Sequence, residues 1–210
     1  MPDDKMSLTL VPGTELPDTA WHTAFTAAFA DYLIGPFQLS LAQWPGFLAR
    51  QGVDLALSRA AVVDGRLLAF ALVAPRPGLV PPRWRLGTMG AVPEARGAGL
   101  APRLLDDFLT RAAAHGAAFA ELEVFAANER ALRLYQGRGF EIVHGLIGYE
   151  RPPAAAAPAA SGGWAPQPVA LDDAWAWLDE AERTLPDLPL QVTAPVLAVA
   201  AATAPQAWRA

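Results

Sequence analysis

A short glycine-containing segment is the part of the sequence best suited to hold an anion. It reads Arg96-Gly97-Ala98-Gly99-Leu100-Ala101 and lies between a strand-like run and a helical pattern. Glycines at such a turn remove side chains, so backbone N–H groups can converge on a phosphate at the positive end of the helix. Arg96 adds a full positive charge there. No Gly-Lys-Ser/Thr follows, and the third glycine of a dinucleotide fingerprint is missing, so neither a P-loop nor a dinucleotide site is indicated.

Polar residues also accompany the next strand-like run. Residues 118–125 alternate in character, so Glu121 and Glu123 share one face of the expected strand while Leu122 lies on the other. Asn128 then has the side chain of a helix N-cap, and the helix it begins is expected to run to residue 136. These two carboxylates therefore lie shortly before the expected start of a helix. The expected helix that begins at residue 100 separates them from the glycine turn.

These segments belong to a series of alternating strands and helices. Asp64-Gly65 between two apolar runs predicts a β-hairpin. The order hairpin, strand, glycine turn, helix, strand, helix is a suitable setting for a phosphate-bearing ligand. Expected strands cover residues 7–11, 57–63, 66–73, 84–92, 118–125, 140–143 and 146–150; expected helices cover residues 19–32, 41–51 and 128–136, with another from residue 100 closed by Gly116.

Composition excludes several other functions. The net charge of −5 gives no support for binding nucleic acid. The chain has no cysteine, and its three histidines show no metal-ligand spacing, so disulfides, thiolate catalysis and a metal site are not expected. The opening MPDDKMSLTL lacks the apolar core of a signal peptide, and no apolar run is long enough to span a bilayer. We expect a cytoplasmic protein without a nucleic-acid or membrane partner.

A change in composition divides the chain of 210 residues. Residues 1–151 carry the series of elements, and residues 152–168 have the Ala, Pro, Ser and Gly content of a linker. Residues 169–210 contain one expected helix, 171–183, and one strand-like run, 196–202. This extension is too short for a secure core of its own. It is expected to dock on the main domain, to mediate a homodimer, or to begin a degenerate second copy of the same fold.

Two motifs resemble those of the GNAT superfamily of N-acetyltransferases. In the first, residues 89–101, a strand and a proline precede Arg96-x-x-Gly99-x-Ala101. The second consists of Leu122-x-Val124, Asn128, Ala131, Leu134-Tyr135 and Gly139-Phe140. The resemblance covers residues 5–150 and implies an α/β fold with a mixed, mostly antiparallel central sheet flanked by helices. It also implies an acyltransferase that moves an acetyl group from acetyl-CoA directly to an amine of a small molecule or peptide.

The resemblance implies roles for particular residues. The strand that ends at Ala91-Val92 would part from its neighbour, so its backbone could pair with pantetheine, and an N–H group near Ala91 would stabilise the oxyanion. The pyrophosphate would lie on N–H groups from Arg96 to Ala101. Asn128 would bond in the same region. Tyr135 would be the general acid, although a phenol with a pKa of about 10 protonates a thiolate with a pKa of about 8.5 only modestly.

The sequence offers three candidate side chains for the general base and does not decide between them. An amine with a pKa of about 10.4 must lose a proton before it attacks the thioester. Glu123, ranked first, Glu121 and His144 are the candidates, acting directly or through water.

An alternative to catalysis follows from the resemblance: many proteins of this superfamily place a carboxylate on the strand equivalent to residues 84–90, and this chain has none there. This absence favours a non-catalytic acyl-CoA-binding sensor or a partner-binding module. Three aromatic residues, Trp21, Phe37 and Trp44, fall where the resemblance places the acceptor, and one or two of them would shape an apolar acceptor site.

Overall fold

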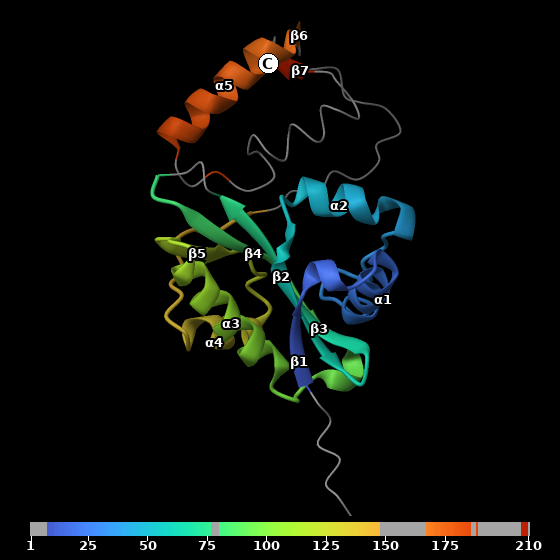
Figure 1. Cartoon of the computed structure of the whole chain (residues 1–210). Coiled ribbons are helices and arrows are strands. Elements are labelled where there is room, and N and C mark those ends of the chain that lie inside the picture. The colour runs from blue at the N-terminus through green and yellow to red at the C-terminus, as the bar shows by residue number, and fades with distance from the viewer. Residues whose placement is uncertain (1–7, 77–79, 148–166, 186–187, 189–206, 210) are drawn as a thin grey trace, which may run out of the picture. The chain divides into compact units, whose positions relative to one another are not determined.

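The computed structural model describes residues 8–76, 80–147, 167–185, 188 and 207–209 (Figure 1). The chain forms two compact units, Met1–Glu141 and Ile142–Ala210. This division falls before the boundary at residue 151 that composition predicts. Most of the linker 152–168 lies outside the described residues, so the domain boundaries stay predictions.

The first unit is built on a five-stranded sheet in the order β1-β2-β3-β4-β5. Neighbouring strands are antiparallel except for β4 and β5, which are parallel. The mixed, mostly antiparallel sheet is therefore confirmed. The strands are β1 (Leu8–Pro12), β2 (Asp54–Val63), β3 (Arg66–Arg76), β4 (Arg83–Ala91) and β5 (Phe119–Leu122).

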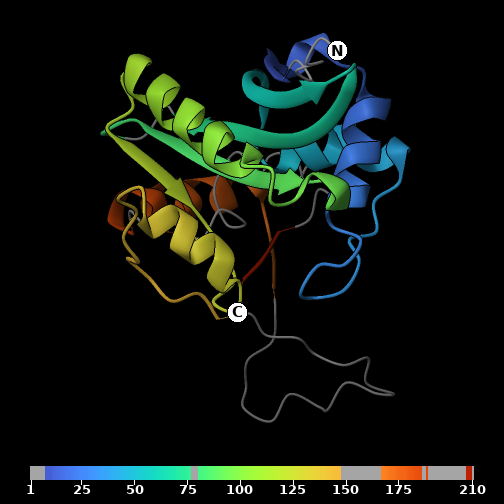
Figure 2. The ribbon, with the colours of Figure 1, turned by 90° about the horizontal axis from the view of Figure 1, so that it is seen from below.

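Helices cover the sheet on both sides. They are α1 (Asp18–Ala28), α2 (Trp44–Arg50), α3 (Leu100–Ala114) and α4 (Glu129–Gln136). Figure 2 shows α3 and α4 on opposite sides of the sheet. The α3 helix buries the apolar stripe that its sequence predicts, with Leu104, Leu105 and Phe108 fully inaccessible. This stripe fixes the helix that follows the glycine turn firmly to the sheet.

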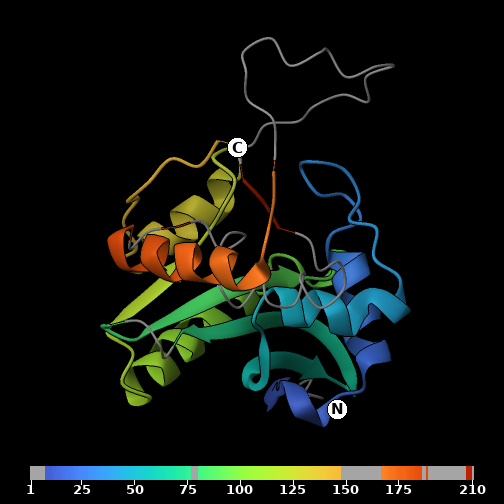
Figure 3. The same ribbon diagram turned by 90° about the horizontal axis from the view of Figure 1, so that it is seen from above.

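Aromatic side chains join α1 and α2, which lie side by side (Figure 3), to β3. Phe25 is the centre of this cluster, with ring contacts to Phe29, Phe37, Trp44, Phe47 and Phe70. Trp21 and Trp44 have no exposed surface. These two tryptophans are core residues that stabilise the fold by burial, whereas Phe37 is 37% exposed.

Three expectations about strand or helix bounds are wrong. The strand expected over residues 118–125 ends at Leu122. The α1 helix ends at Ala28, and residues 29–32 leave the helical path. Residues 140–143 form no strand, nor do residues 146–147, while residues 148–150 lie outside the described part of the chain. Strand preference reflects fit to a half-buried pleated surface, whereas Ile142 and Val143 are 69% and 78% exposed.

The second unit contains a helix and a small sheet. Its elements are β6 (Gln167–Val169), α5 (Leu171–Thr184) and β7 (Ala207–Arg209), with β6 and β7 antiparallel. The α5 helix confirms the helix predicted over 171–183, whereas residues 196–202 lie outside the described residues. In the described part of the chain, no helix is long and apolar enough to cross a bilayer.

Candidate functional site

An opening in the sheet lies beside the end of β4. Pairing between β4 and β5 covers Arg83 with Phe119 through Leu86 with Leu122 and then stops, while β4 stays paired to β3 as far as Ala91. Figure 2 shows β5 turning away from β4 toward α4. The residues of β4 from 87 to 91 therefore have one edge without a strand partner among the described residues. This is the parting of strands that the resemblance implies.

The hydrogen-bond pattern of β4 decides which backbone groups face the opening. The Val92 N–H donates to the Leu68 carbonyl over 2.9 Å, and the Val92 carbonyl accepts from the Ala95 N–H. Backbone groups alternate sides along an antiparallel strand, so the N–H and carbonyl groups of Ala91 and Met89 point toward β5. The chain therefore offers Ala91 as a backbone donor at the opening, whereas the backbone of Val92 is already used and its side chain is buried.

The glycine turn leaves the opening accessible. Gly97 and Gly99 have φ angles of 85° and 77°, a left-handed conformation that side-chain-bearing residues adopt at a cost. A Cβ atom at either position would meet nothing within 4 Å. Glycine is therefore required by the backbone path rather than by crowding, and the turn faces open space.

Free N–H groups gather where this turn becomes α3. Leu100 and Ala101 occupy the first positions of the helix, where N–H groups have no intrahelical acceptor. By contrast, the N–H groups of Arg96 and Ala98 donate to Pro93 and Ala95 carbonyls, at 3.2 and 3.4 Å. The best anion donors are thus at the helix start, aided by the helix dipole.

Arg96 is paired with a residue far away in the sequence. Its Nη1 and Nη2 atoms each lie 2.6 Å from a carboxylate oxygen of Asp31, and Nη2 also donates to the Ala28 carbonyl at 3.0 Å. Hydrogen bonding to Asp31 raises the pKa of Arg96 and lowers the pKa of Asp31. The positive charge predicted beside the glycine turn is therefore largely neutralised by a carboxylate.

Asn128 and Tyr135 lie on the β5 side of the opening. The Asn128 side chain accepts a hydrogen bond from the Ala131 N–H at 3.2 Å, which confirms the predicted N-cap of α4. Tyr135 is half-buried and contacts the ring of Phe140. Burial, together with the charge of Tyr32, raises the pKa of Tyr135 to about 12. Its hydroxyl group therefore keeps its proton at every physiological pH.

The two glutamates predicted as bases are both ion-paired. Glu123, just beyond β5, lies 3.1 Å from Nη2 of Arg85, whose side chain is 5% exposed. Glu121 binds Arg76 at 3.0 Å and Arg83 at 3.3 Å. Burial lowers the pKa of Arg85, while Glu123 and Glu121 act to raise it. Glu123 is the nearer of the two to the opening, because the paired part of β5 ends at Leu122.

His144, the third candidate base, falls in the second unit. Tyr32 was not among the predicted site residues, because the sequence predicted it as the last residue of the helix over residues 19–32. Burial raises the pKa of Tyr32 and a hydrogen bond with the Asn128 side chain acts to lower it, so the phenol lies at the predicted site. The sequence carries no signal that would bring Tyr32 and Asn128 together.

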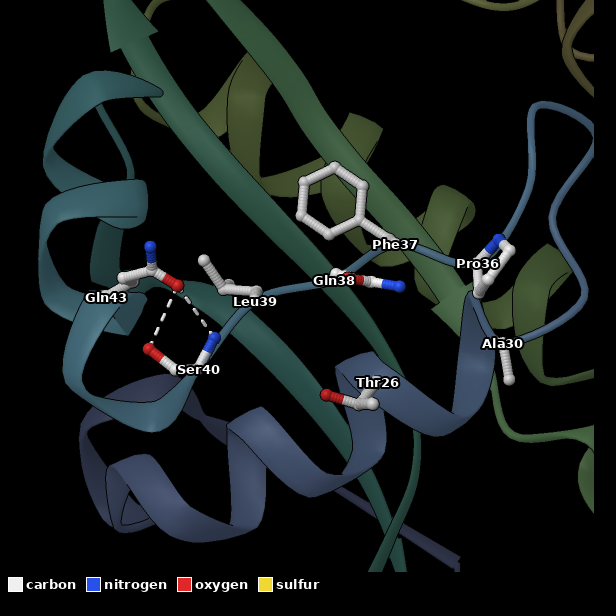
Figure 4. A pocket seen from close by; sticks show the side chains of 8 residues that line it. All are labelled: Thr26, Ala30, Pro36, Phe37, Gln38, Leu39, Ser40 and Gln43. Atoms are coloured by element: carbon white, nitrogen blue, oxygen red, sulfur yellow. Dashed lines mark hydrogen bonds between the residues drawn. The ribbon is translucent and has the colours of Figure 1, made fainter.

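An open hollow of about 620 Å³ lies between α1 and the segment 36–43 (Figure 4). It is lined by Thr26, Ala30, Pro36, Phe37, Gln38, Leu39, Ser40 and Gln43. None of the residues at the β4–β5 opening lines it. We therefore regard it as a feature of the loop after α1 rather than as the reaction site.

A mixed sheet whose parallel strands part beside a glycine turn defines a class of protein that binds an elongated, phosphate-bearing ligand along β4. The chain belongs to the Acetyltransferase (GNAT) family, whose sequence profile matches residues 18–140.

A curated relative is the mycothiol acetyltransferase of Paenarthrobacter aurescens (strain TC1). It is 33% identical over 146 residues, which cover 67% of this chain and 43% of the relative. The aligned part is therefore less than half of the relative's length.

Solved structures share the fold at low identity. An aminoglycoside N-acetyltransferase in complex with CoA is 20% identical with a TM-score of 0.53, over 72% of this chain and 98% of that one. A ribosomal-protein-alanine N-acetyltransferase from Brucella melitensis biovar Abortus 2308 is 16% identical with a TM-score of 0.54, over 69% of this chain and 99% of that one.

Proposed function

We propose that this protein transfers an acetyl group from acetyl-CoA directly to an amine. The observation that carries the proposal is the edge of β4 that no described strand pairs with, which leads into an open turn and the N–H groups at the start of α3. Pantetheine carries amides that suit a strand edge, and a pyrophosphate suits a helix N-terminus. Membership of the acetyltransferase family supports acetyl-CoA as the ligand with both parts.

The chain supplies binding and orientation along this path. The N–H groups of Gly99, Leu100 and Ala101 would hold the pyrophosphate, with Gly97 and Ala98 shaping the turn. Ala91 would direct its N–H group at the thioester oxygen, where a fixed donor stabilises the developing oxyanion. Arg96 would act mainly by holding the turn to α1, because Asp31 already balances its charge.

Proton transfer involves the residues on the β5 side. We propose Tyr135 as a hydrogen-bond donor to the departing thiolate, and Glu123 as the group that accepts the amine proton, directly or through water. Each carboxylate oxygen can accept more than one hydrogen bond, so the ion pair with Arg85 does not by itself prevent Glu123 from accepting a proton. Glu121 is the second choice, since its two oxygens already contact Arg76 and Arg83.

A non-catalytic acyl-CoA-binding protein is the second candidate function. The ion pairs of Glu121 and Glu123 favour it, because both candidate bases are already engaged by arginines. Such a protein would bind acetyl-CoA tightly without turnover.

The cytoplasmic location and the homodimer remain predictions.

Release of free thiol from acetyl-CoA in the presence of a panel of amines tests the proposal. The names of the relatives suggest an aminoglycoside and a peptide with an N-terminal alanine as first acceptors. We expect amine-dependent thiol release with at least one acceptor. Stabilisation by CoA in a thermal shift, about 2.7 kcal/mol at one hundred times the dissociation constant, without thiol release would support the non-catalytic function instead.

A further inference from the structure

The end of α1 lies directly on β4, next to the opening. A Cβ atom added to Gly90 would lie 3.2 Å from the Cβ of Ala28 and 3.3 Å from a ring carbon of Phe29. No side chain fits between the strand and the last turn of the helix. The residues that follow, Asp31 and Tyr32, are therefore carried to the place where β4 and β5 part.

Asp31 fixes this segment on the β4 side. Its carboxylate binds both terminal nitrogens of Arg96, which follows β4, and the same guanidinium also binds the Ala28 carbonyl. A bidentate pair of this kind restricts orientation as well as distance.

Tyr32 contacts the β5 side. Its ring lies edge-on to Phe29 and to Phe125, with centroid distances of 5.0 and 5.8 Å. Phe125 accepts a backbone hydrogen bond from the Asn128 N–H at 2.8 Å, so this ring belongs to the turn that begins α4. A hydrogen bond with the Asn128 side chain acts to lower the pKa of Tyr32, and Tyr32 in turn acts to raise the pKa of Tyr135. Two consecutive residues thus connect the two sides of the opening.

We propose that Tyr32 is a positioning residue for acetyl transfer: held in place through Asp31 and Arg96, it contacts Phe125 and Asn128 and so fixes the start of α4 and the Tyr135 hydroxyl group at the opening. This inference rests on the proposed function. The loop after Tyr32 starts with a tight turn, in which the Gly35 N–H donates to the Tyr32 carbonyl at 2.9 Å. Tyr32 therefore also sets where the exposed segment from Leu33 to Phe37 begins.

Tyr32→Phe tests the role of the hydroxyl group, because it keeps the ring that packs on Phe125. We expect kcat to fall about tenfold, with the dissociation constant of CoA changed by less than about twofold. Because Tyr32 acts through Tyr135, adding Tyr32→Phe to Tyr135→Phe is expected to cause no further loss. Thr23→Val is the matched control, since it removes a hydroxyl group of α1 that bonds only within the helix, to the Thr19 carbonyl at 2.8 Å.

The outcomes separate this inference from the proposed function. Wild-type activity in Tyr32→Phe, or losses that multiply in the double variant, would refute the positioning role. Failure of the wild-type chain to release thiol with any amine would instead refute the proposed function. NMR of the ligand-free protein then still decides the inference: Tyr32→Phe is expected to shift the signals of the Asn128 side-chain amide and the Tyr135 ring, and unchanged signals would overturn it.

Discussion

Replacement of Tyr135 by phenylalanine separates two ways in which a phenol can assist a departing thiolate. Burial and the charge of Tyr32 raise the pKa of Tyr135 to about 12. Against a thiol pKa of about 8.5, complete proton transfer is uphill by about 3.5 units, or roughly 5 kcal/mol. A hydrogen bond donated to the charged sulfur contributes about 1.5–3 kcal/mol instead. We therefore expect Tyr135→Phe to lower kcat by about 10- to 150-fold, with CoA binding near normal.

The pH dependence of thiol release gives the sharper test of this reasoning. Because its pKa is raised, Tyr135 keeps its proton well above pH 10, so the ratio of wild-type to variant kcat is expected to stay constant from about pH 7 to about pH 10.5. A phenol with an ordinary pKa of about 10 would lose its effect within that range. A ratio that falls toward one above about pH 9.5, or an unchanged kcat in Tyr135→Phe, would refute the role assigned here.

Gly99→Glu is expected to abolish CoA binding in a thermal shift, because it places a negative side chain at the phosphate site; Gly116→Glu is the matched control, with a φ of 75° at the other end of α3 and the same backbone cost. Loss of binding in both variants, or in neither, would contradict this location. Asp31→Asn frees the guanidinium on the glycine turn and is expected to tighten CoA binding about two- to fivefold by calorimetry. Glu94→Gln, which removes an exposed carboxylate from the same loop, is its control, and weaker binding in Asp31→Asn would contradict the expectation. Glu123→Gln is expected to lower kcat about 100-fold with little change in KM for acetyl-CoA; an unchanged kcat would remove Glu123 from proton transfer.

Local sequence signals predicted the framework of the site well. The hairpin at Asp64-Gly65 and the stripe of α3 depend on neighbouring residues and on periodicity, so they can be recognised from a short window. The same holds for the N-cap at Asn128, whose partner is three residues away. Each of these features is decided by contacts that are close in sequence.

Features that depend on distant partners were not predictable in the same way. The contact of Arg96 with Asp31 spans 65 positions, and no pattern in either segment indicates it. The pairing of Glu123 with Arg85 likewise depends on the register of parallel strands, which the crossover through α3 sets. Tyr32 was predicted as part of the helix over residues 19–32 because a 3.6-residue period continues through it, although the helix ends at Ala28.

Because the end of β4 is paired to β3 but not to β5, hydrogen exchange along this strand can report whether a ligand is bound. Amide protons at Met89 and Ala91 face the edge that has no strand partner in the described part of the chain, whereas the Val92 N–H donates to the Leu68 carbonyl. Hydrogen exchange is slowed where an amide is bonded and buried. A ligand that lies along this edge would therefore slow deuterium uptake at alternate positions of a single strand and leave the intervening positions unchanged.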